Sequence, residues 1–478
     1  MRIALLLVVF IASVVSARHK ALDKILVEEN PDTEENRERI NAILNRVRQN
    51  RGRVQGRSPF STFQKPDKKN LPAKNINKTE INEVNKDIHE YTFEGDIMLN
   101  TDQANALTDE AAGGRKKRQA TTDPTKYWDI DTPIYYTFHP KLTPAKIASI
   151  RKGIQFWNDN TCLTFKENST GPNRLYFTSA GGCWSSVGKQ GTSYQLVSIG
   201  DGCEGLGTVT HEIAHALGFW HQQSRYDRDR YLYIDFNNIQ SSLRYNFDKL
   251  PLSQASLLDQ PYDYGSVMQY GAYSFAQNPY DYTIYARQQE YQNTLGQREK
   301  PAFSDIQMVN KLYQCEDKRC STKLACQNGG FTDSRNCSQC ICPMYFGGQL
   351  CDELPVGDAV SCNGQVVEAT QKWQKFNLSA GDKNSYTYLD TPQTCYWIIK
   401  APIGKRVLLN ILNTDTNCLD GCPWQSVEMN SGNYQTYGMT ICCSTFQGQT
   451  YSSTNNTIAI RSVVRYNTVT FGFQYRYY

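Results

Sequence analysis

Three histidines and a glutamate within residues 211–221, HEIAHALGFWH, have the spacing of a catalytic metal site. His211 and His215 are one helical turn apart, so a helix would place both imidazoles on one face. Gly218 stands where a helix can end in a left-handed residue, which lets the chain reverse and bring in His221 as a third nitrogen ligand. Three protein ligands leave one coordination position open, which is typical of catalytic rather than structural zinc.

The donor set also predicts the reaction. Histidine nitrogens favour zinc over magnesium or calcium, which prefer oxygen, so we expect one zinc ion per catalytic domain. Zinc would polarise a peptide carbonyl while Glu212 accepts a proton from water and passes it to the leaving amine. The alternative is a helix that merely carries histidines, but only six occur in the chain and three of them are here. The motif therefore predicts peptide-bond hydrolysis without a covalent intermediate.

The elements before the motif must position it, and they mix strand and helix. Residues 126–138, KYWDIDTPIYYTF, are aromatic and β-branched and predict a strand. Thr143 and Pro144 have the types of a helix cap and a first-turn residue. Behind them, isoleucines and a tryptophan recur at helical spacing at Ile147, Ile150, Ile154 and Trp157.

The first 118 residues have the composition of a leader. Residues 1–17 combine a lone basic residue, a short apolar run and small residues at Val15, Ser16 and Ala17, as in a removed signal peptide. Residues 18–118 are polar and end in the basic run ArgLysLysArg, so we expect a propeptide cleaved after Arg118. No later apolar stretch reaches the roughly 18 residues of a membrane anchor, and the product is expected to be secreted and extracellular.

Charge argues against a nucleic-acid partner. The whole chain carries a formal +4, but residues 1–118 hold 21 basic against 17 acidic side chains and the rest holds 30 of each. The mature protein is thus neutral and lacks the electrostatic motive for binding nucleic acid.

The sixteen cysteines indicate an oxidising compartment and three cross-linked units. None precedes Cys162, and they fall into one group of four and two groups of six, ending at Cys315, Cys351 and Cys443. From the count alone, the four cysteines of the first group allow three pairings.

The extended motif HEIAHALGFWHQQSRYDRDRY, followed by SerValMetGlnTyr at 266–270, resembles the astacin family of metzincins. The resemblance covers nearly the whole chain. It implies that Met268 underlies the metal and that Tyr270 is a displaceable ligand that can swing to stabilise the oxyanion. It also implies the disulfides Cys162–Cys315 and Cys183–Cys203.

The same resemblance implies how the enzyme is kept inactive. Astacin propeptides carry a Phe-x-Gly-Asp element, and here Phe93, Glu94, Gly95 and Asp96 precede the basic run. Asp96 would give zinc a carboxylate in the zymogen only. A cysteine switch is excluded, because no cysteine precedes Cys162. One departure is Gln222, which stands where the family has a glutamate that contacts the new N-terminus, at Gln119 or Ala120 here.

Two further modules follow by resemblance. Residues 316–352, with CQNGG at 326–330 and YFGGQLC at 345–351, resemble an EGF-like domain, which implies Cys320–Cys337, Cys326–Cys340 and Cys342–Cys351. Residues 362–478 have short alternating strand patterns and resemble a CUB domain with Cys362–Cys395. The pairing of Cys418, Cys422, Cys442 and Cys443 stays open. Calcium is doubtful, because Gln425 aligns with an acidic residue that many CUB domains use to bind it.

The predicted fold is therefore multidomain: an α+β metzincin domain at 119–315 with a mixed sheet and an active-site helix, a small disulfide-rich EGF-like module and an all-β CUB sandwich. The predicted function is a zinc metalloendopeptidase acting on extracellular proteins. Similarity to secreted nematode astacins makes matrix or cuticle proteins candidate substrates. The alternatives are a catalytically silent adhesion or scaffold protein and another metzincin branch. Glycosylation sequons occur at Asn77, Asn168, Asn336, Asn377 and Asn455.

Overall fold

The computed structural model describes residues 41–42, 45, 80–109, 120–250 and 255–478. The signal peptide, most of residues 18–79, the sequon at Asn77 and the processing run ending at Arg118 lie outside the described residues. Among the helices that it describes, none is both long enough and apolar enough to cross a membrane.

The described part of the leader, residues 80–109, packs against the domain that follows it. It contains the helices α3 (Ile81–Val84) and α4 (Thr101–Asp109). Between them Phe93 and Ile97 exchange two backbone hydrogen bonds of 2.8 and 3.0 Å and close a tight turn. Glu94 and Gly95 lie in the left-handed region of φ in this turn, which glycine adopts without steric cost. We call residues 93–97 the pro-turn.

A five-stranded sheet forms one layer of the next domain. Its order is β3 (Phe165–Glu167), β2 (Ile134–Phe138), β4 (Arg174–Thr178), β6 (Tyr194–Ile199) and β5 (Cys183–Ser185), all parallel except β5. The strand expected over 126–138 was too long. Pro124–Lys126 is a 3-10 helix, and Trp128 is buried with its indole donating to Ala216 O at 2.7 Å, so only the second half pairs as strand.

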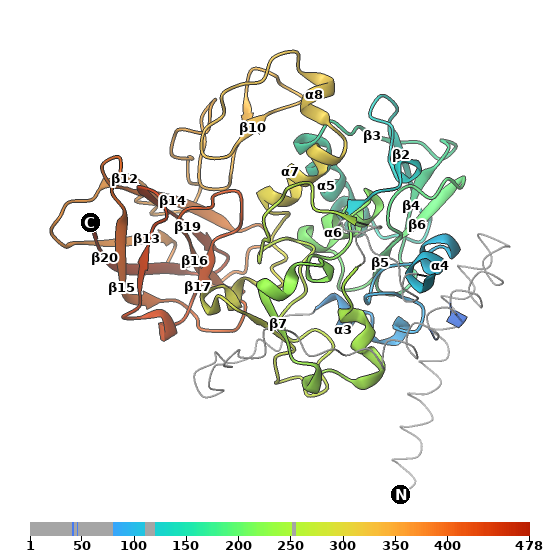
Figure 1. Cartoon of the computed structure of the whole chain (residues 1–478), viewed down its shortest axis with the longest axis horizontal. Helices are drawn as coiled ribbons and strands as arrows, with labels where there is room; N and C mark the ends of the chain where they lie inside the picture. The colour runs from blue at the N-terminus through green and yellow to red at the C-terminus, as the bar shows by residue number, and fades with distance from the viewer. Residues whose placement is uncertain (1–40, 43–44, 46–79, 110–119, 251–254) are drawn as a thin grey trace, which may run out of the picture.

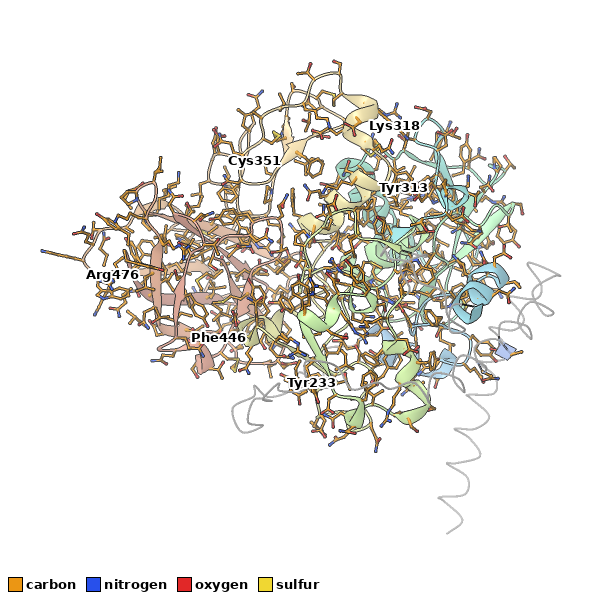
Figure 2. The ribbon with its side chains drawn as sticks, viewed as in Figure 1. Tyr233, Tyr313, Lys318, Cys351, Phe446 and Arg476 are labelled. Carbon is orange, nitrogen blue, oxygen red and sulfur yellow. A yellow bond between two sulfur atoms is a disulfide. The ribbon has the colours of Figure 1, made fainter. Side chains whose placement is uncertain are left out.

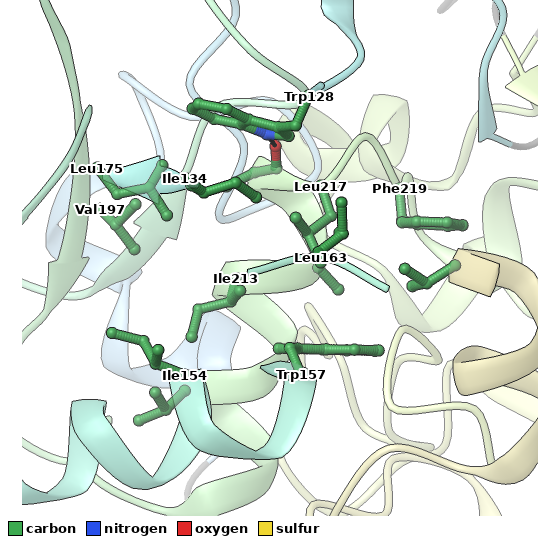
Figure 3. Close-up of a cluster of buried hydrophobic side chains, with 14 of the residues drawn as sticks. Trp128, Ile134, Ile154, Trp157, Leu163, Leu175, Val197, Ile213, Leu217 and Phe219 are labelled. Atoms are coloured by element: carbon green, nitrogen blue, oxygen red, sulfur yellow. Dashed lines mark hydrogen bonds between the residues drawn. The ribbon is translucent and has the colours of Figure 1, made fainter. Parts of the chain in front are cut away.

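Two helices pack beside this sheet. The expected helix α5 (Pro144–Asn160) begins as predicted, with the Thr143 side chain accepting from Lys146 N, and α6 (Leu206–Ala216) carries the first two histidines of the motif. A Cβ on Gly153 would lie 2.5 Å from Val209 Cγ1, so the two helices approach closely here. Trp157 donates to Thr210 O at 3.0 Å across the same contact, within the hydrophobic cluster of Figure 3.

The rest of the catalytic region, to Cys315, contains little regular structure. It includes β1 (Ala120–Thr121) paired with β8 (Ala255–Ser256), β7 (Leu232–Ile234) paired with β9 (Ile284–Ala286), and the helix α7 (Phe303–Leu312). Helix α8 (Cys315–Arg319) leads into a cysteine-rich segment, residues 320–351, whose only regular strands among the described residues are β10 (Phe331–Thr332) and β11 (Cys340–Ile341).

The C-terminal residues form a two-sheet sandwich (Figure 1). One sheet has the order β12 (Val366–Glu368), β14 (Gln393–Lys400), β19 (Thr457–Val464), β16 (Gln425–Asn430) and β17 (Met439–Ile441). The other is β13 (Gln374–Gly381), β20 (Thr468–Tyr477), β15 (Val407–Asp415) and β18 (Thr450–Ser452). Figure 2 places Phe446 and Arg476 in this sandwich, Cys351 in the cysteine-rich segment, and Tyr313 and Lys318 at the edge of the catalytic region.

All sixteen cysteines are paired in the structure. The six pairs that the resemblance implies are formed, and the four cysteines left open pair as Cys418–Cys443 and Cys422–Cys442. Every disulfide closes within one of the three cysteine groups, so no disulfide joins one unit to another.

Candidate metal centre

The three histidines of the motif converge on one point. His211 and His215 project from α6, which ends at Ala216, and Gly218 has a φ of 105° that turns the chain back toward the site. His221 then approaches the same point. The Nε2 atom of His211 lies 3.1 Å from that of His215 and 3.3 Å from that of His221. All three side chains are buried.

The other ring nitrogens are held by hydrogen-bond acceptors. His211 Nδ1 lies 2.8 Å from Val267 O, His215 Nδ1 lies 2.7 Å from Phe219 O, and His221 Nδ1 lies 2.7 Å from Glu94 Oε2. Carbonyl and carboxylate oxygens can only accept here, so each Nδ1 carries the hydrogen and each Nε2 presents a lone pair. Three lone pairs facing one another in a buried site repel unless a cation lies between them.

Asp96 of the pro-turn supplies an oxygen to the same point. Its Oδ2 lies 3.2 Å from Nε2 of His211, and its Oδ1 lies 3.1 Å from Nε2 of His221 and 3.5 Å from that of His215. The four ligand atoms all lie within 4.8 Å of one another. Tetrahedral zinc with nitrogens at about 2.0–2.1 Å requires ligand atoms about 3.3 Å apart, so the residues fit this ion.

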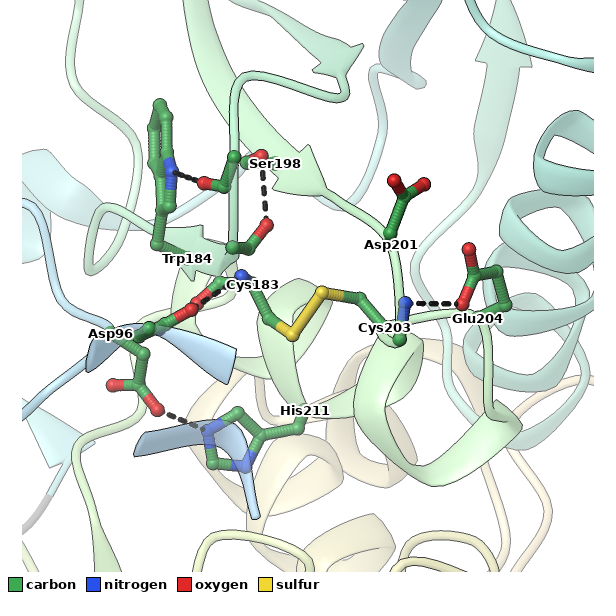
Figure 4. The surroundings of a disulfide bond; sticks show 12 residues. Asp96, Cys183, Trp184, Ser198, Asp201, Cys203, Glu204 and His211 are labelled. Carbon is green, nitrogen blue, oxygen red and sulfur yellow. Dashed lines mark hydrogen bonds and ion pairs between the residues drawn. A yellow bond between two sulfur atoms is a disulfide. The ribbon is translucent and has the colours of Figure 1, made fainter. Parts of the chain in front are cut away.

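Asp96 reaches the histidines because its main chain extends an edge strand. Ser185 N donates to Asp96 O at 3.0 Å, and Met98 N donates to Ser185 O at 2.9 Å, which adds the pro-turn to the edge of β5. Figure 4 shows Asp96 beside Cys183, the first residue of β5, with its carboxylate directed at His211. The pro-turn therefore covers both the metal ligands and the edge of the sheet at β5.

Glu212 lies beside the histidines without taking part in the four-residue group. Its side chain is fully buried, and neither carboxylate oxygen has a hydrogen-bond partner among the described residues. Burial raises the pKa of Glu212 well above its usual range, the charge of Asp96 raises it further, and Arg298 opposes both. A buried carboxyl with unused oxygens next to a metal site is suited to exchanging protons with a bound reactant.

The side chains that could bind the metal shift one another's pKa values. Burial lowers the pKa of His211 to about 3, which keeps its ring neutral and able to bind a metal. Burial lowers the pKa of His221, but the carboxylates of Asp96 and Glu94 outweigh this effect and raise the pKa to about 9. Burial would raise the pKa of Asp96, yet the charge that His221 carries when protonated, and the short contacts of the Asp96 carboxylate with the three rings, hold it well below its usual range.

Tyr270 lies at the site but outside the ligand group. Its hydroxyl donates to the backbone carbonyl of Glu94, and its ring centroid is 4.7 Å from that of His221. Met268 is buried, and its carbonyl accepts from Gln222 N, the residue after His221, at 2.9 Å. The pro-turn therefore holds the Tyr270 hydroxyl.

Gln222 and the first described residues of the catalytic region are buried. Gln222 is buried, and the nearby Ala120 is also buried, forming a backbone bridge with Phe219. Thr121 N donates to Gly218 O at 3.0 Å. Of the sequons that the structure describes, Asn336, Asn377 and Asn455 are exposed and Asn168 is half-buried.

Several residues of the site were not predicted from the sequence. Glu94 binds His221 and also accepts from Ser224 Oγ at 2.7 Å. Asp305 accepts from Ser266 Oγ at 2.6 Å and from Val267 N at 2.8 Å, and so supports the carbonyl that holds His211. Glu94 could have been predicted, because it lies inside the Phe-x-Gly-Asp element. No motif in the sequence marks Asp305 as a residue of the site.

Comparisons with known proteins agree with this geometry. The model of the family Astacin (Peptidase family M12A) matches residues 120–314, and that of the CUB domain matches residues 362–477. "Zinc metalloproteinase nas-28" of Caenorhabditis elegans is 50% identical over 480 residues, covering 98% of this chain and 96% of that relative. "Zinc metalloproteinase dpy-31" of Teladorsagia circumcincta is 34% identical, covering 86% of this chain and 67% of that relative.

Among solved structures, the hatching-enzyme zinc protease HCE-1 of Oryzias latipes is 31% identical, with a TM-score of 0.38, and covers 40% of this chain and 96% of its own. The predicted fold class is confirmed: a multidomain chain with an α+β metzincin domain, a disulfide-rich segment and a CUB sandwich. Because "Zinc metalloproteinase nas-28" is 50% identical over almost the full length of both chains, the chain belongs to the astacin family of zinc metalloproteinases.

Proposed function

We propose that this zinc metalloproteinase is made as a secreted zymogen, is processed after Arg118, and hydrolyses peptide bonds in extracellular proteins. We propose the domain bounds expected from the sequence: a signal peptide at 1–17, a propeptide at 18–118, a catalytic domain at 119–315, an EGF-like module at 316–352 and a CUB domain at 362–478. The eight disulfides, all within cysteine groups, support an oxidising compartment.

One observation carries the zymogen proposal. The Asp96 carboxylate contacts all three histidines while its main chain pairs with Ser185 at the edge of β5. A protein substrate needs the same edge for its backbone and the same point for its scissile carbonyl. The pro-turn and a substrate therefore exclude one another.

After the propeptide leaves, the chain's own residues have separate tasks. His211, His215 and His221 would hold zinc, which supplies Lewis acidity toward a peptide carbonyl. Glu212 takes a proton from the attacking water and delivers it to the leaving amine. Tyr270, released from the Glu94 carbonyl, is free to donate its hydroxyl hydrogen to the developing oxyanion.

The test is to express the full chain, process it at Arg118, measure zinc per molecule and assay cleavage of a generic unfolded protein beside Glu212→Ala. We expect one zinc per molecule in both forms and cleavage by the wild type only. Stoichiometric zinc with no cleavage by either form would support a silent scaffold. Equal cleavage by both forms would remove Glu212 from its role.

A further inference from the structure

A buried polar junction joins the CUB sandwich to the catalytic domain. Its sandwich side is the segment 434–440, which we call the docking segment, at the β17 edge. Its catalytic side consists of two segments. One is the loop 263–270, which carries Met268 and which we call the methionine loop, and the other is residues 291–299. Figure 1 shows the β16–β17 edge turned toward the catalytic region. Tyr437 of the docking segment is 3% exposed, so its contact with the catalytic domain excludes water.

The docking segment is bound through main-chain and side-chain groups. Tyr437 N donates to both carboxylate oxygens of Asp263 at 3.1 Å. Thr440 N donates to Thr294 Oγ1 at 3.1 Å, and Gly438 N donates to Tyr345 Oη of the cysteine-rich segment at 2.7 Å. The packing is equally close, since a Cβ on Gly265 would lie 2.2 Å from Tyr437 Cβ.

A buried charge network crosses the same junction. Arg461 of β19 is fully buried and bonds Glu428 of β16 at 2.8 Å and Glu299 of the catalytic domain at 2.7 Å. The Tyr437 hydroxyl donates to Glu299 Oε2 at 3.0 Å. Charges without partners are costly in a buried site, so Glu299 and Arg461 favour the docked arrangement over any that separates them.

From Asp263 the contacts lead to a metal ligand. The Asp263 carboxylate accepts from Gly265 N at 2.9 Å and from Ser304 Oγ at 2.6 Å. The next residue, Asp305, accepts from Ser266 Oγ and Val267 N, and Val267 O holds Nδ1 of His211 at 2.8 Å. Acceptors behind ligating histidines fix the ring orientation and strengthen metal binding.

A second set of contacts starts at Glu299. Its neighbour Arg298 donates to Gln269 O at 3.0 Å, and Gln297 donates to Gly265 O at 2.7 Å. The methionine loop is thus held at both ends by the two residues that precede Glu299, and Glu299 is the residue that Tyr437 and Arg461 bind.

We propose that the CUB domain is a positioning module for the metal site: the docking segment and Arg461 hold the methionine loop, and through Val267 they orient His211. The alternative is a spacer whose contact with the catalytic domain has no effect on the metal. The two differ in what happens to the metal when the junction is weakened.

The first experiment inserts a recognition sequence for a specific protease after Val356, which is 95% exposed. No disulfide crosses this position, since Cys342–Cys351 and Cys362–Cys395 close on either side of it. We expect the cut CUB domain to co-elute with the catalytic domain on gel filtration. Separate elution of the cut wild-type protein at micromolar concentration would overturn the proposal.

The second experiment compares Tyr437→Ala with Tyr388→Ala, a matched control in the same sandwich whose ring is 46% exposed. In the processed full chain, Tyr437→Ala should release zinc to a chromophoric chelator roughly 10-fold faster or more and alter the absorption spectrum of the cobalt-substituted protein. Its kcat should fall while KM changes less. Tyr388→Ala should match the wild type in all of these.

Tyr437→Phe, which keeps the ring and loses only the hydroxyl that binds Glu299, should restore zinc retention and the cobalt spectrum. If Tyr437→Ala does not fold, zinc release from the cut wild type decides the question: it should accelerate once the protein is diluted until the CUB domain separates, and an unchanged rate would overturn the proposal. Normal zinc release and an unchanged cobalt spectrum in a folded Tyr437→Ala would show that the CUB domain does not position the site. These readouts follow metal geometry and domain association, so they do not depend on the identity of the substrate.

Discussion

Asn85 binds both main-chain polar groups of Cys183: its Oδ1 accepts from Cys183 N at 2.8 Å and its Nδ2 donates to Cys183 O at 2.6 Å. The same Nδ2 donates to Gly95 O at 2.8 Å. One fully buried amide of the leader therefore connects the pro-turn that carries Asp96 to the start of β5.

Asn85→Ala should loosen the pro-turn. The substitution leaves three buried main-chain groups without these partners, at a cost of about 1–3 kcal/mol each. We expect faster hydrogen exchange of the amides in residues 93–98 and measurable cleavage of a quenched peptide by the unprocessed chain. Asn82→Ala is the control, because the Asn82 amide makes only a 3.5 Å contact with its neighbour Glu83. Equal exchange in the two variants would contradict the role of Asn85.

Asp96→Asn should activate the unprocessed chain more than Glu94→Gln does. Asparagine keeps the size of Asp96 but removes the charge that faces the three histidines, whereas glutamine at 94 can still accept from His221 Nδ1 with its oxygen and donate to Ser224 Oγ with its amide nitrogen. Hydrogen bonds to charged groups contribute about 1.5–3 kcal/mol, so peptidase activity before processing should rise roughly 10- to 100-fold for Asp96→Asn. A well-folded Asp96→Asn chain with no activity would argue against Asp96 as the inhibitory group.

Tyr270→Phe should lower kcat of the processed enzyme by roughly 100- to 1000-fold, the usual effect of removing one oxyanion donor. KM and zinc content should change little, because the ring still packs against His221 and Tyr270 is not among the four clustered ligands. Steady-state kinetics and metal analysis on the same preparation check this. A rise in KM at constant kcat would instead place Tyr270 in substrate binding.

Acid should release the CUB domain from the cut protein. Burial favours the neutral form of Glu299, but Arg461, with Lys300 and Arg465, outweighs it and lowers the pKa of Glu299 to about 2. A lowered carboxyl pKa stabilises the docked state above the ordinary value of 4.5, and this stability is lost as pH falls toward 2. We expect the co-eluting fraction to fall through this window.

Glu299→Gln is the control for the acid experiment. It should weaken docking at neutral pH and flatten the dependence below pH 4.5. Burial raises the pKa of Glu428, so its contribution has the opposite sign and cannot produce the loss in acid. An unchanged acid profile in Glu299→Gln would assign the release to other carboxyls.

Local patterns predicted the histidine site, and long-range contacts supplied what they missed. The spacing of His211, His215 and Gly218 was sufficient because helix periodicity and a left-handed terminus are properties of a few adjacent residues. The expected strand over 126–138 failed where tertiary packing took Trp128 into the core instead. Tyr437 and Asp263 are 174 positions apart, and no local rule relates them.

The nested disulfides of the catalytic domain set an order for its oxidation during synthesis. Cys162 enters the oxidising compartment long before Cys315, its partner 153 positions later. Cys183 and Cys203, only 20 positions apart, emerge in between and are its nearest wrong partners. If those two pair first, Cys162 is left waiting for Cys315, so the short inner bond protects the long outer one. In this order, disulfides cross-link the growing chain from its middle outward.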